Sequence, residues 1–586
     1  MRAELAEAAT GVRKPDLTLA NVNLVNVLTE EVEEQVSISV YRGRVVYVGR
    51  SPPEAKLHVD AKGAYAIPGL IDSHIHIESS MLSVRRFAEA VLPHGTTAVF
   101  TDPHEIANVL GLSGVKLILE ESEGIPLKVY VEVPSCVPAA PGLETYGAEL
   151  TPGDVAKALG WERVVGLAEV MSYPAVIAGE PSVHEKIRAA LSANLAVEGH
   201  APSLTGRELA AYIASGVQSD HECTSGEEAL EKARRGMWIE AREGSTMRNL
   251  ASLLPELAKH PASLEQCTLA SDDREVLDLL TKGHMDHVVN RAIELGLDPV
   301  KAVKLASLNP ARRFRLDHEI GCIAPGRRAD ILLCTSLSPL RVEEVYADGK
   351  LVAKSGELAA RIPEFKHPSY ALNTIKAKLP APELIAVKAG IDRGACKARV
   401  IEVKEGEAYT RMLVKELEVK AGLVQPSIEE DVLLATVVER HRASGSFSVG
   451  FVSGFRLERG AIASSIGHDS HNLTSVGADS ASIHTALKAV AEMQGGLAVA
   501  EGSRVLARLQ LKLAGLMSTD PPSKVADGLR RVLEAARQLG CEMDNPFMPL
   551  SFLPLPVIPE ARLTDKGLVD ARGLRIVPVV VEELPS

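Results

Sequence analysis

The chain has 586 residues, of which 46% are hydrophobic, 24% charged and only 4% aromatic, and its formal net charge is −13 with a pI near 5.8. This composition predicts a soluble globular protein of two or three domains. The acidic balance argues against nucleic acid as a partner, because nucleic-acid-binding faces are usually basic. We also expect no membrane partner, since no apolar run is long enough to cross a bilayer and no signal-peptide core is present. Seven scattered cysteines without a CxxC pair predict reduced thiols and a cytoplasmic location.

The first 66 residues are predicted to form β-strands. Short runs rich in β-branched residues lie at residues 16–19, 36–40 and 44–48. The Tyr41-Arg42-Gly43 step between the last two runs is typical of a hairpin turn. Strong helical periodicity is absent, so we expect residues 1–66 to supply strands to a small β domain.

Residues 67–320 alternate short apolar runs with longer helix-like stretches, which predicts βα units and a parallel sheet. Eight repeats over roughly 250 residues match the size of a (β/α)₈ TIM barrel, which carries its chemistry at the C-terminal ends of its strands. The eight candidate strands have polar ends, near residues 74–78, 101–104, 132–135, 169–172, 198–202, 219–222, 240–243 and 271–273.

The chain returns to β character at residues 321–365, where residues 321–333 and 342–352 look like strands. We expect these strands to pair with the first 66 residues, so that the small β domain is built from both flanks of the barrel. A polar, proline-containing stretch at residues 362–369 is predicted to be a linker. Residues 370–586 mix strands and helices and are predicted to form a separate C-terminal α/β domain.

His74 and His76 lie at the end of the first predicted strand and are followed by a polar loop. Residues two apart in a strand point to the same side, so one metal ion can contact both imidazoles. Six ligand-type residues at strand ends exceed the needs of one tetrahedral ion, and we therefore predict a binuclear centre bridged by Glu169. Mixed nitrogen and oxygen ligands suit Zn²⁺, Fe²⁺ or Mn²⁺. The predicted metal ligands are His74, His76, Glu169, His200, His221 and Asp272.

Each of these residues also has an ordinary structural interpretation. A single histidine at a strand end is commonly a hydrogen-bonded surface or core residue, and Asp272 is a favourable residue to cap a helix. Glu169 alone could form an ion pair with an arginine. The position of all six residues at predicted strand ends is better explained by a shared metal site.

The order of these ligands resembles that of the amidohydrolase superfamily. Four blocks, at residues 74–81, 92–97, 102–109 and 464–472, resemble the signature blocks of the adenine deaminase family, and the likeness extends over nearly the whole chain. Several amidohydrolases use a carbamylated lysine as the bridge, whereas the fourth strand here offers Glu169, which fits the deaminase branch. The chain has no PCxxC motif, which excludes the cytidine-type zinc deaminases.

The resemblance implies hydrolytic deamination of adenine to hypoxanthine and ammonia, in purine salvage, with Mn or Fe favoured and Zn also compatible. Asp272 would ligate a metal, accept a proton from the attacking water and pass it to the leaving amine. A second acid must protonate N1 of the purine, and the sequence does not choose among Glu78, His104, Glu105 and Asp220. We assign catalytic roles to Asp272, Glu78 and Glu105. Contact with the substrate is predicted for His104, Asp220, His468 and His471.

Three of these assignments have alternatives. His104 and Glu105 could bind an auxiliary metal, or their loop could simply cap the next helix. Glu78 could hold a metal-binding histidine in orientation. The polar loop at residues 467–472 could reach the active site or be a structural turn of a satellite domain.

Two other functions are compatible with the sequence. One is a neighbouring amidohydrolase reaction, such as deamination of guanine or cytosine or hydrolysis of a cyclic amide. The other is a non-catalytic barrel that binds a partner, against which the six filled ligand positions argue. The resemblance to the amidohydrolase superfamily also implies a homodimer.

Overall fold

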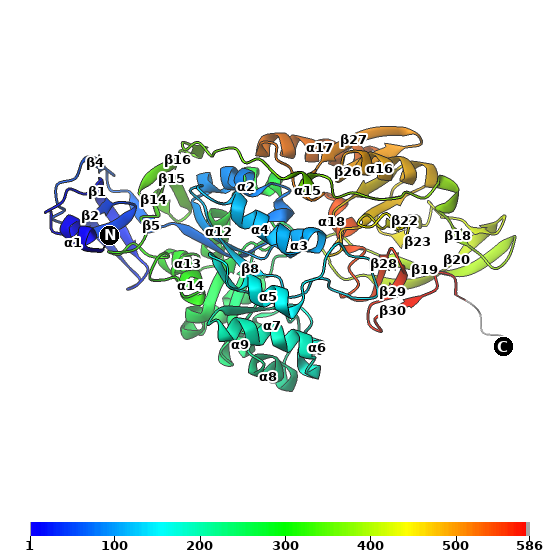
Figure 1. Ribbon diagram of the computed structural model, residues 1–586, viewed down its shortest axis with the longest axis horizontal. Coiled ribbons are helices and arrows are strands. Elements are labelled where there is room, and N and C mark those ends of the chain that lie inside the picture. Colours follow the sequence, from blue (N-terminus) through cyan, green and yellow to red (C-terminus); the bar gives the residue numbers. More distant parts are fainter. Residues whose placement is uncertain (1, 582–586) are drawn as a thin grey trace.

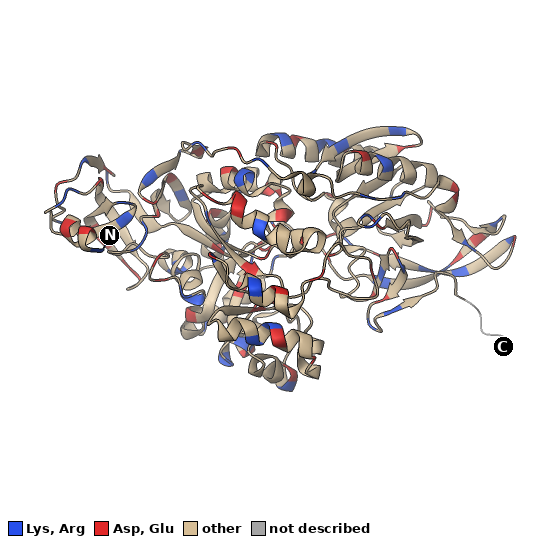
Figure 2. Cartoon of the chain, viewed as in Figure 1, with Lys and Arg blue, Asp and Glu red and all other residues tan. Residues whose placement is uncertain are grey.

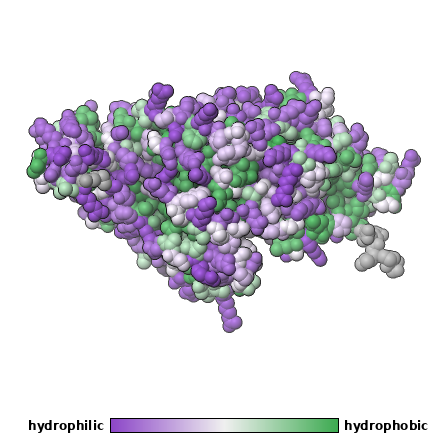
Figure 3. All heavy atoms as spheres, in the orientation of Figure 1, coloured by the Kyte–Doolittle hydropathy of each residue, from purple (hydrophilic) through white to green (hydrophobic). Residues whose placement is uncertain are grey.

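The computed structural model describes residues 2–581. Three regions follow one another along the long axis of the molecule: an N-terminal sheet, a central region of parallel strands and helices, and a C-terminal region (Figure 1). Acidic and basic side chains are interspersed over the helices and strands of all three regions (Figure 2). Hydrophilic residues cover most of the face over the N-terminal sheet, and hydrophobic residues gather toward the C-terminal end (Figure 3). None of the helices in the described part of the chain has the length and apolar character that a membrane crossing requires.

The N-terminal sheet contains strands from both sequence flanks of the central region. Its strand order is β17-β16-β15-β14-β5-β1-β2-β3, and β4 pairs with β1. The antiparallel pair of β5 and β14, in which Pro68 lies opposite Ile331, joins the two flanks. The strands are β1 (Leu17–Asn26), β2 (Glu31–Tyr41), β3 (Arg44–Gly49), β4 (Leu57–Asp60), β5 (Tyr65–Pro68), β14 (Ile331–Leu337), β15 (Leu340–Ala347), β16 (Lys350–Lys354) and β17 (Glu357–Leu358).

Three local expectations for this sheet were wrong. A helix, α1 (Arg2–Ala9), precedes the first strand and packs Ala8 against Tyr41; its alanine- and glutamate-rich sequence has no clear apolar stripe. The first ten residues of the predicted strand at 321–333 are irregular, because Pro325-Gly326 makes a turn before β14. Residues 342–352 are two strands, since the chain reverses at Asp348-Gly349.

The central region contains eight parallel strands, one at each predicted position. They form two arcs, with strand orders β10-β9-β8-β7-β6 and β11-β12-β13. All side chains of β7 and β9 are buried, as expected for parallel strands covered on both faces. The strands are β6 (Leu70–Ile75), β7 (Thr96–Thr101), β8 (Lys128–Val133), β9 (Val164–Val170), β10 (Ala196–Gly199), β11 (Ser219–Asp220), β12 (Trp238–Arg242) and β13 (Cys267–Ala270).

The two arcs contact each other at both of their edges. At one edge, Ile75 and Asp272 form a parallel bridge, in which the Asp272 N–H donates to the carbonyl of His74 at 2.9 Å. At the other edge, the N–H of Gln218 donates to the carbonyl of Val197 at 3.0 Å.

Helices connect and cover these strands. The α-helices are α2 (Val84–Val91), α3 (His104–Leu110), α4 (Leu112–Glu121), α5 (Pro152–Ala158), α6 (Tyr173–Ala178), α7 (Pro181–Ser192), α8 (Gly206–Ala214), α9 (Gly226–Arg234), α10 (Leu250–Ala258), α11 (Val276–Thr281), α12 (Met285–Glu294), α13 (Pro299–Leu305) and α14 (Leu308–Arg313). Three 3₁₀ helices are η1 (Ile77–Ser80), η2 (Leu92–His94) and η3 (Pro261–Gln266).

The C-terminal region is built on a ten-stranded sheet of order β18-β21-β20-β19-β23-β22-β25-β24-β26-β27. Its strands are β18 (Val387–Lys388), β19 (Gly394–Glu402), β20 (Arg411–Lys420), β21 (Leu423–Val424), β22 (Leu433–Val438), β23 (Phe447–Ser453), β24 (Ala461–Ser464), β25 (Leu473–Gly477), β26 (Gly496–Glu501) and β27 (Arg504–Gln510). A smaller sheet contains β28 (Ala561–Thr564), β29 (Gly567–Asp570) and β30 (Arg575–Val577). The helices are α15 (Ser369–Leu372), η4 (Pro382–Leu384), α16 (Ser480–Glu492), α17 (Pro522–Gln538) and α18 (Phe547–Phe552).

We predict that Gly199→Ala destabilises the junction between the two arcs. A Cβ at Gly199 would lie 2.1 Å from the carbonyl oxygen of Ser219, so alanine would push β10 away from β11. We expect the free energy of unfolding to fall by about 1–3 kcal/mol, measured by urea denaturation. Gly390→Ala is the control, because a Cβ there meets nothing within 4 Å and the backbone of Gly390 is not in the positive-φ region. Equal stability of Gly199→Ala and the wild type would contradict the prediction.

Candidate metal centre and substrate cavity

The first group of predicted ligands lies where β6 and β13 end. His74 is fully buried in β6, and His76 follows that strand. Oδ1 of Asp272 lies 3.8 Å from Nε2 of His74 and 3.3 Å from Nε2 of His76. Asp272 has φ 59°, in the left-handed region that is unusual for a residue other than glycine and is frequent at functional sites. Asp272 does not cap a helix, because α11 begins after Glu275.

The second group lies at the ends of β9, β10 and β11. Oε2 of Glu169 is 2.6 Å from Nδ1 of His200 and 3.2 Å from Nε2 of His221. The other oxygen of Glu169, Oε1, lies 3.3 Å from Nε2 of His76. The Glu169 carboxylate therefore lies between the two groups, which is the position of a bridging ligand.

These residues fit two divalent metal ions. His74-His76-Asp272 and Glu169-His200-His221 are each close enough to hold one ion. Ligand atoms at about 2.0–2.3 Å from one ion lie roughly 3–4 Å apart, as most of these atoms do. Both ring nitrogens of His74 and Nδ1 of His221 are buried without a hydrogen-bond partner in the described part of the chain, which is costly unless another group contacts them.

Electrostatics give three of the predicted ligands, His74, Glu169 and Asp272, the protonation states that metals require. Burial opposes protonation of His76 and His200, but neighbouring carboxylates raise the pKa of both imidazoles, so a metal would have to displace a proton from each. Burial lowers the pKa of His74 well below its ordinary value, with further lowering by His221 and His76. Burial opposes ionisation of Glu169, but His221 and His200 hold its pKa well below the ordinary value. Asp272 is likewise kept anionic, because Arg242 and His76 outweigh its burial and lower its pKa.

Arg242, at the end of β12, joins the neighbouring strand ends. Its Nη1 donates to Oδ2 of Asp272 at 2.5 Å and to Oε1 of Glu222 at 2.5 Å. Thus one oxygen of Asp272 faces the histidines and the other faces Arg242. This strand end was predicted at residues 240–243, but Arg242 was not predicted to belong to the site, because arginine is not a metal ligand.

A cavity of about 360 Å³ opens next to the ligands, within the size range of small-molecule sites. Five of the six predicted ligands line it, and His74 lies behind them. The C-terminal region supplies the opposite wall, which includes Tyr409, Asp469 and Phe552. Asp469 lies in the polar loop at residues 467–472, which was expected to be able to reach the active site. Tyr409 and Phe552 were not predicted, since no sequence motif marks the segments in which they lie.

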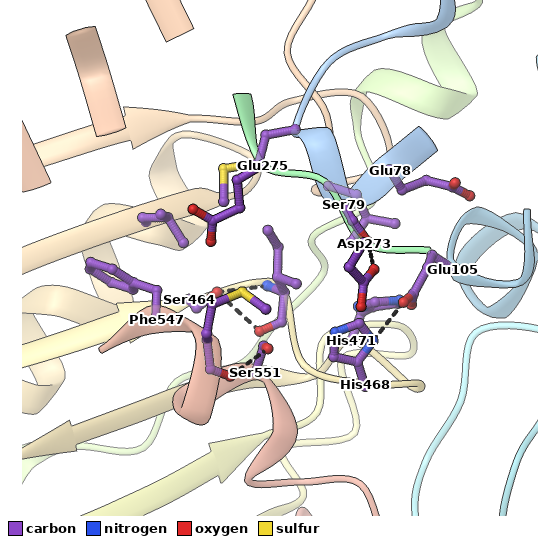
Figure 4. A pocket seen from close by; sticks show the side chains of 15 residues that line it. Glu78, Ser79, Glu105, Asp273, Glu275, Ser464, His468, His471, Phe547 and Ser551 are labelled. Atoms are coloured by element: carbon purple, nitrogen blue, oxygen red, sulfur yellow. Dashed lines mark hydrogen bonds and ion pairs between the residues drawn. The ribbon is translucent and has the colours of Figure 1, made fainter. Parts of the chain in front are cut away.

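The polar loop at residues 467–472 reaches this cavity and is more than a structural turn. Nδ1 of His468 lies 2.5 Å from Oε1 of Glu105, and Nε2 of His471 lies 2.5 Å from Oε2 of the same carboxylate. Figure 4 shows the three side chains together at the edge of a smaller neighbouring cavity. Burial opposes both ionisations, but Glu105 raises the pKa of His468 to about 9, and His468 and His471 hold the pKa of Glu105 well below its ordinary value.

His104 lies between this loop and the metal ligands. Its Nδ1 is 3.1 Å from Oδ2 of Asp102 and 3.5 Å from Oε1 of Glu169, and its Nε2 is 3.5 Å from Oε1 of Glu105. Burial lowers the pKa of His104, but Asp102 and Glu105 outweigh burial, so its pKa lies well above the ordinary value. His104 therefore faces the substrate cavity beside carboxylates that favour its protonated form.

Glu78 and Asp220 do not line the substrate cavity. Oε1 of Glu78 accepts a hydrogen bond from the N–H of Ile106 at 3.1 Å in the first turn of α3, and burial raises the pKa of Glu78 to about 7. Asp220 is fully buried and accepts a hydrogen bond from Nζ of Lys232 at 3.0 Å. These locations argue against direct substrate contact by either residue; Glu78 instead fixes the helix that carries His104 and Glu105.

Two triads of histidines and a carboxylate, at the ends of parallel strands, define a metal-dependent hydrolase of the amidohydrolase class. The Amidohydrolase family model matches residues 65–352, and the model named Adenine deaminase C-terminal domain matches residues 407–574. The chain is 42% identical to the adenine deaminase of Staphylothermus marinus, over 99% of this chain and 98% of that protein. It is 43% identical to an adenine deaminase of Dehalococcoides mccartyi and 41% identical to that of Moorella thermoacetica, each over 98% of both chains. The chain belongs to the adenine deaminase family.

We predict that Asp220→Asn destabilises the protein without loss of bound metal. Burial opposes ionisation of Asp220, but Lys232 and His221 lower its pKa to about 2. The variant should lower the free energy of unfolding by about 1–3 kcal/mol at pH 7. Because the folded pKa is depressed, this stability is present above the unfolded pKa near 4 and is lost as the pH falls toward 2. Urea denaturation at several pH values and metal analysis check the prediction; loss of metal with unchanged stability would contradict it.

Proposed function

We propose that this protein hydrolyses adenine to hypoxanthine and ammonia, and that it does so in purine salvage. The proposal is carried by one observation: Glu169 joins two ligand triads at the floor of a cavity whose opposite wall belongs to the family's own C-terminal domain, because it belongs to one triad and also lies 3.3 Å from His76 of the other. Membership of the adenine deaminase family supports the choice of substrate.

We further propose that the two arcs of parallel strands act as one closed (β/α)₈ barrel at residues 67–320. The backbone hydrogen bonds at both edges of the arcs support this closure. Residues 1–66 and 321–365 would then form the small β domain, and residues 370–586 the C-terminal domain. The pairing of β5 with β14 supports the first of these assignments.

The proposed metal ligands are His74, His76, Glu169, His200, His221 and Asp272, with Mn or Fe favoured and Zn compatible. A divalent cation, when bound there, supplies Lewis acidity and lowers the pKa of water toward neutrality. The protein residues contribute fixed, buried donors, so that the site needs little rearrangement during the reaction.

Proton transfer is assigned to residues that line the cavity. Asp272 accepts a proton from the water that attacks C6 of adenine and returns it to the departing amine, which leaves as ammonia. His104, cationic and facing the cavity, donates the proton to N1, while Glu105 and Asp102 hold its ring. Glu78 and Asp220 are not proposed as proton donors, because neither lines the cavity. The water oxygen remains on C6, and its second proton passes to His104 as the carbonyl of hypoxanthine forms, so that Asp272 and His104 both return to their starting states.

We expect the purified protein to convert adenine to hypoxanthine and to release one ammonia per base, because the cavity joins a purine-sized space to a metal centre. Removal of metal with a chelator should abolish the reaction, and added Mn²⁺ should restore it. Chromatography of the bases and an ammonia assay measure this. Guanine and cytosine are the control substrates: ammonia from one of them, with no hypoxanthine from adenine, would move the assignment to a neighbouring amidohydrolase reaction.

Asp272→Asn should lower kcat by about 100- to 10,000-fold, because an amide cannot accept the proton from water. The folded protein should be retained, since the amide preserves the shape of the side chain. Asp220→Asn is the matched control and should keep kcat near that of the wild type, as Asp220 lies behind the cavity. Steady-state kinetics, together with metal analysis and circular dichroism, measure the effect. A metal-replete Asp272→Asn protein with wild-type kcat would exclude Asp272 as the proton acceptor.

A further inference from the structure

The outer wall of the substrate cavity consists of two short segments of the C-terminal domain. Residues 408–409 and residues 552–559 supply it, and most of its side chains are apolar. Such a surface suits the flat face of a purine. No helix or strand runs through residues 553–560, so backbone hydrogen bonds of regular structure do not fix this wall. The N–H of Thr410 donates to the carbonyl of Pro559, and the N–H of Glu560 donates to the carbonyl of Thr410, each at 3.2 Å. These two backbone hydrogen bonds join the segments only beside Thr410, and a side chain joins them elsewhere.

That side chain is Arg562, the second residue of β28. Its side chain is fully buried, and its guanidinium donates only to backbone carbonyls. Nη1 donates to Phe552 at 2.8 Å, Nε donates to Ile558 at 2.7 Å, and Nη2 donates to Pro559 at 3.1 Å and also to Ala408. All four carbonyls belong to residues that line the substrate cavity.

No carboxylate among residues 2–581 forms an ion pair with Arg562, so the charge is buried without an anionic partner. Burial lowers the pKa of Arg562 to about 9. A buried unpaired charge is costly, and here four hydrogen bonds to carbonyls of the cavity wall offset that cost. Only a planar group with five N–H donors can serve four carbonyls that converge from two segments.

We propose that Arg562 is a positioning residue that holds the outer wall of the cavity and thereby determines how tightly the purine binds. The inference rests on the proposed function, since it takes the cavity to be the adenine site. Arg562 contacts none of the six proposed metal ligands. Its loss should therefore affect substrate binding far more than the chemical step.

Thr410 offers an independent way to loosen the same wall. Its Oγ1 donates to the carbonyl of Ala561 at 2.7 Å and accepts from the N–H groups of Glu560 at 3.2 Å and Ala561 at 3.1 Å. Thr410 therefore ties the two segments together from the other side, without a charge. Thr410→Val keeps the shape of the side chain and removes these hydrogen bonds.

The test compares Arg562→Lys and Thr410→Val with the wild type. Lysine keeps the charge but presents its donors from a single atom, so it cannot serve all four carbonyls. We expect Arg562→Lys to raise KM for adenine by about tenfold or more, corresponding to at least one lost hydrogen bond, with kcat changed by less than about threefold and with unchanged metal content. Thr410→Val should raise KM in the same direction, which keeps the inference testable if Arg562→Lys does not fold.

Arg440→Lys is the matched control, because Arg440 is equally buried in the same domain and donates to Ala514, which does not line the cavity. It should leave KM unchanged. The inference is overturned if KM stays at the wild-type value in both wall variants, or if kcat and metal content fall while KM does not rise. A wild-type protein that forms no hypoxanthine would instead overturn the proposed function, so the two failures are distinguishable.

Discussion

The site depends on the Glu169 carboxylate, around which the ends of five parallel strands are arranged. One of its oxygens faces His76 and His104, and the other faces His200 and His221. Burying an imidazole or a carboxylate is costly unless the group has a hydrogen-bond partner or a partner of opposite charge. Parallel strands meet this requirement, because their C-terminal ends all lie at one edge of the sheet and project side chains to a common point. The metal centre therefore follows from the topology as much as from the residue types.

A second set of contacts couples this centre to the C-terminal domain. Glu105 lies on α3, beside the strand ends, and its only imidazole partners at 2.5 Å within residues 2–581 come from the loop that carries His468 and His471. Glu105 in turn lies close to His104, which contacts Glu169. A continuous chain of charged groups thus runs from the metal ligands to the C-terminal loop. We infer that the domain belongs to the active site and is more than an attachment to it.

The six proposed metal ligands could be predicted from the sequence, because each lies at or just after the end of a predicted strand. His74 and His76 are two residues apart, and the alternation of side chains along an extended chain predicts that they point to the same side. The remaining ligands follow runs of apolar residues, and the order of these runs along the chain assigned each ligand to a strand end. Asp220 ends a strand in the same way, yet it pairs with Lys232, twelve residues later on α9. The strand pattern shows where a side chain leaves the sheet, but it does not show which helix residue packs behind it. Tyr409, Phe552 and Arg562 were beyond prediction, because their positions depend on how two distant irregular segments pack.

The two domains supply different parts of the site. The strand ends supply every proposed metal ligand and both proposed proton-transfer residues, whereas the C-terminal domain supplies the apolar wall and the partners of Glu105. Without that domain, Glu105 would be a carboxylate beside Glu78 and Asp102 with no imidazole from the loop to offset the charge, and the cavity would be open to water. Water at the ligands would weaken every electrostatic interaction among them. The barrel alone therefore has the residues for the chemistry but lacks the dry, bounded cavity in which those residues act on a purine.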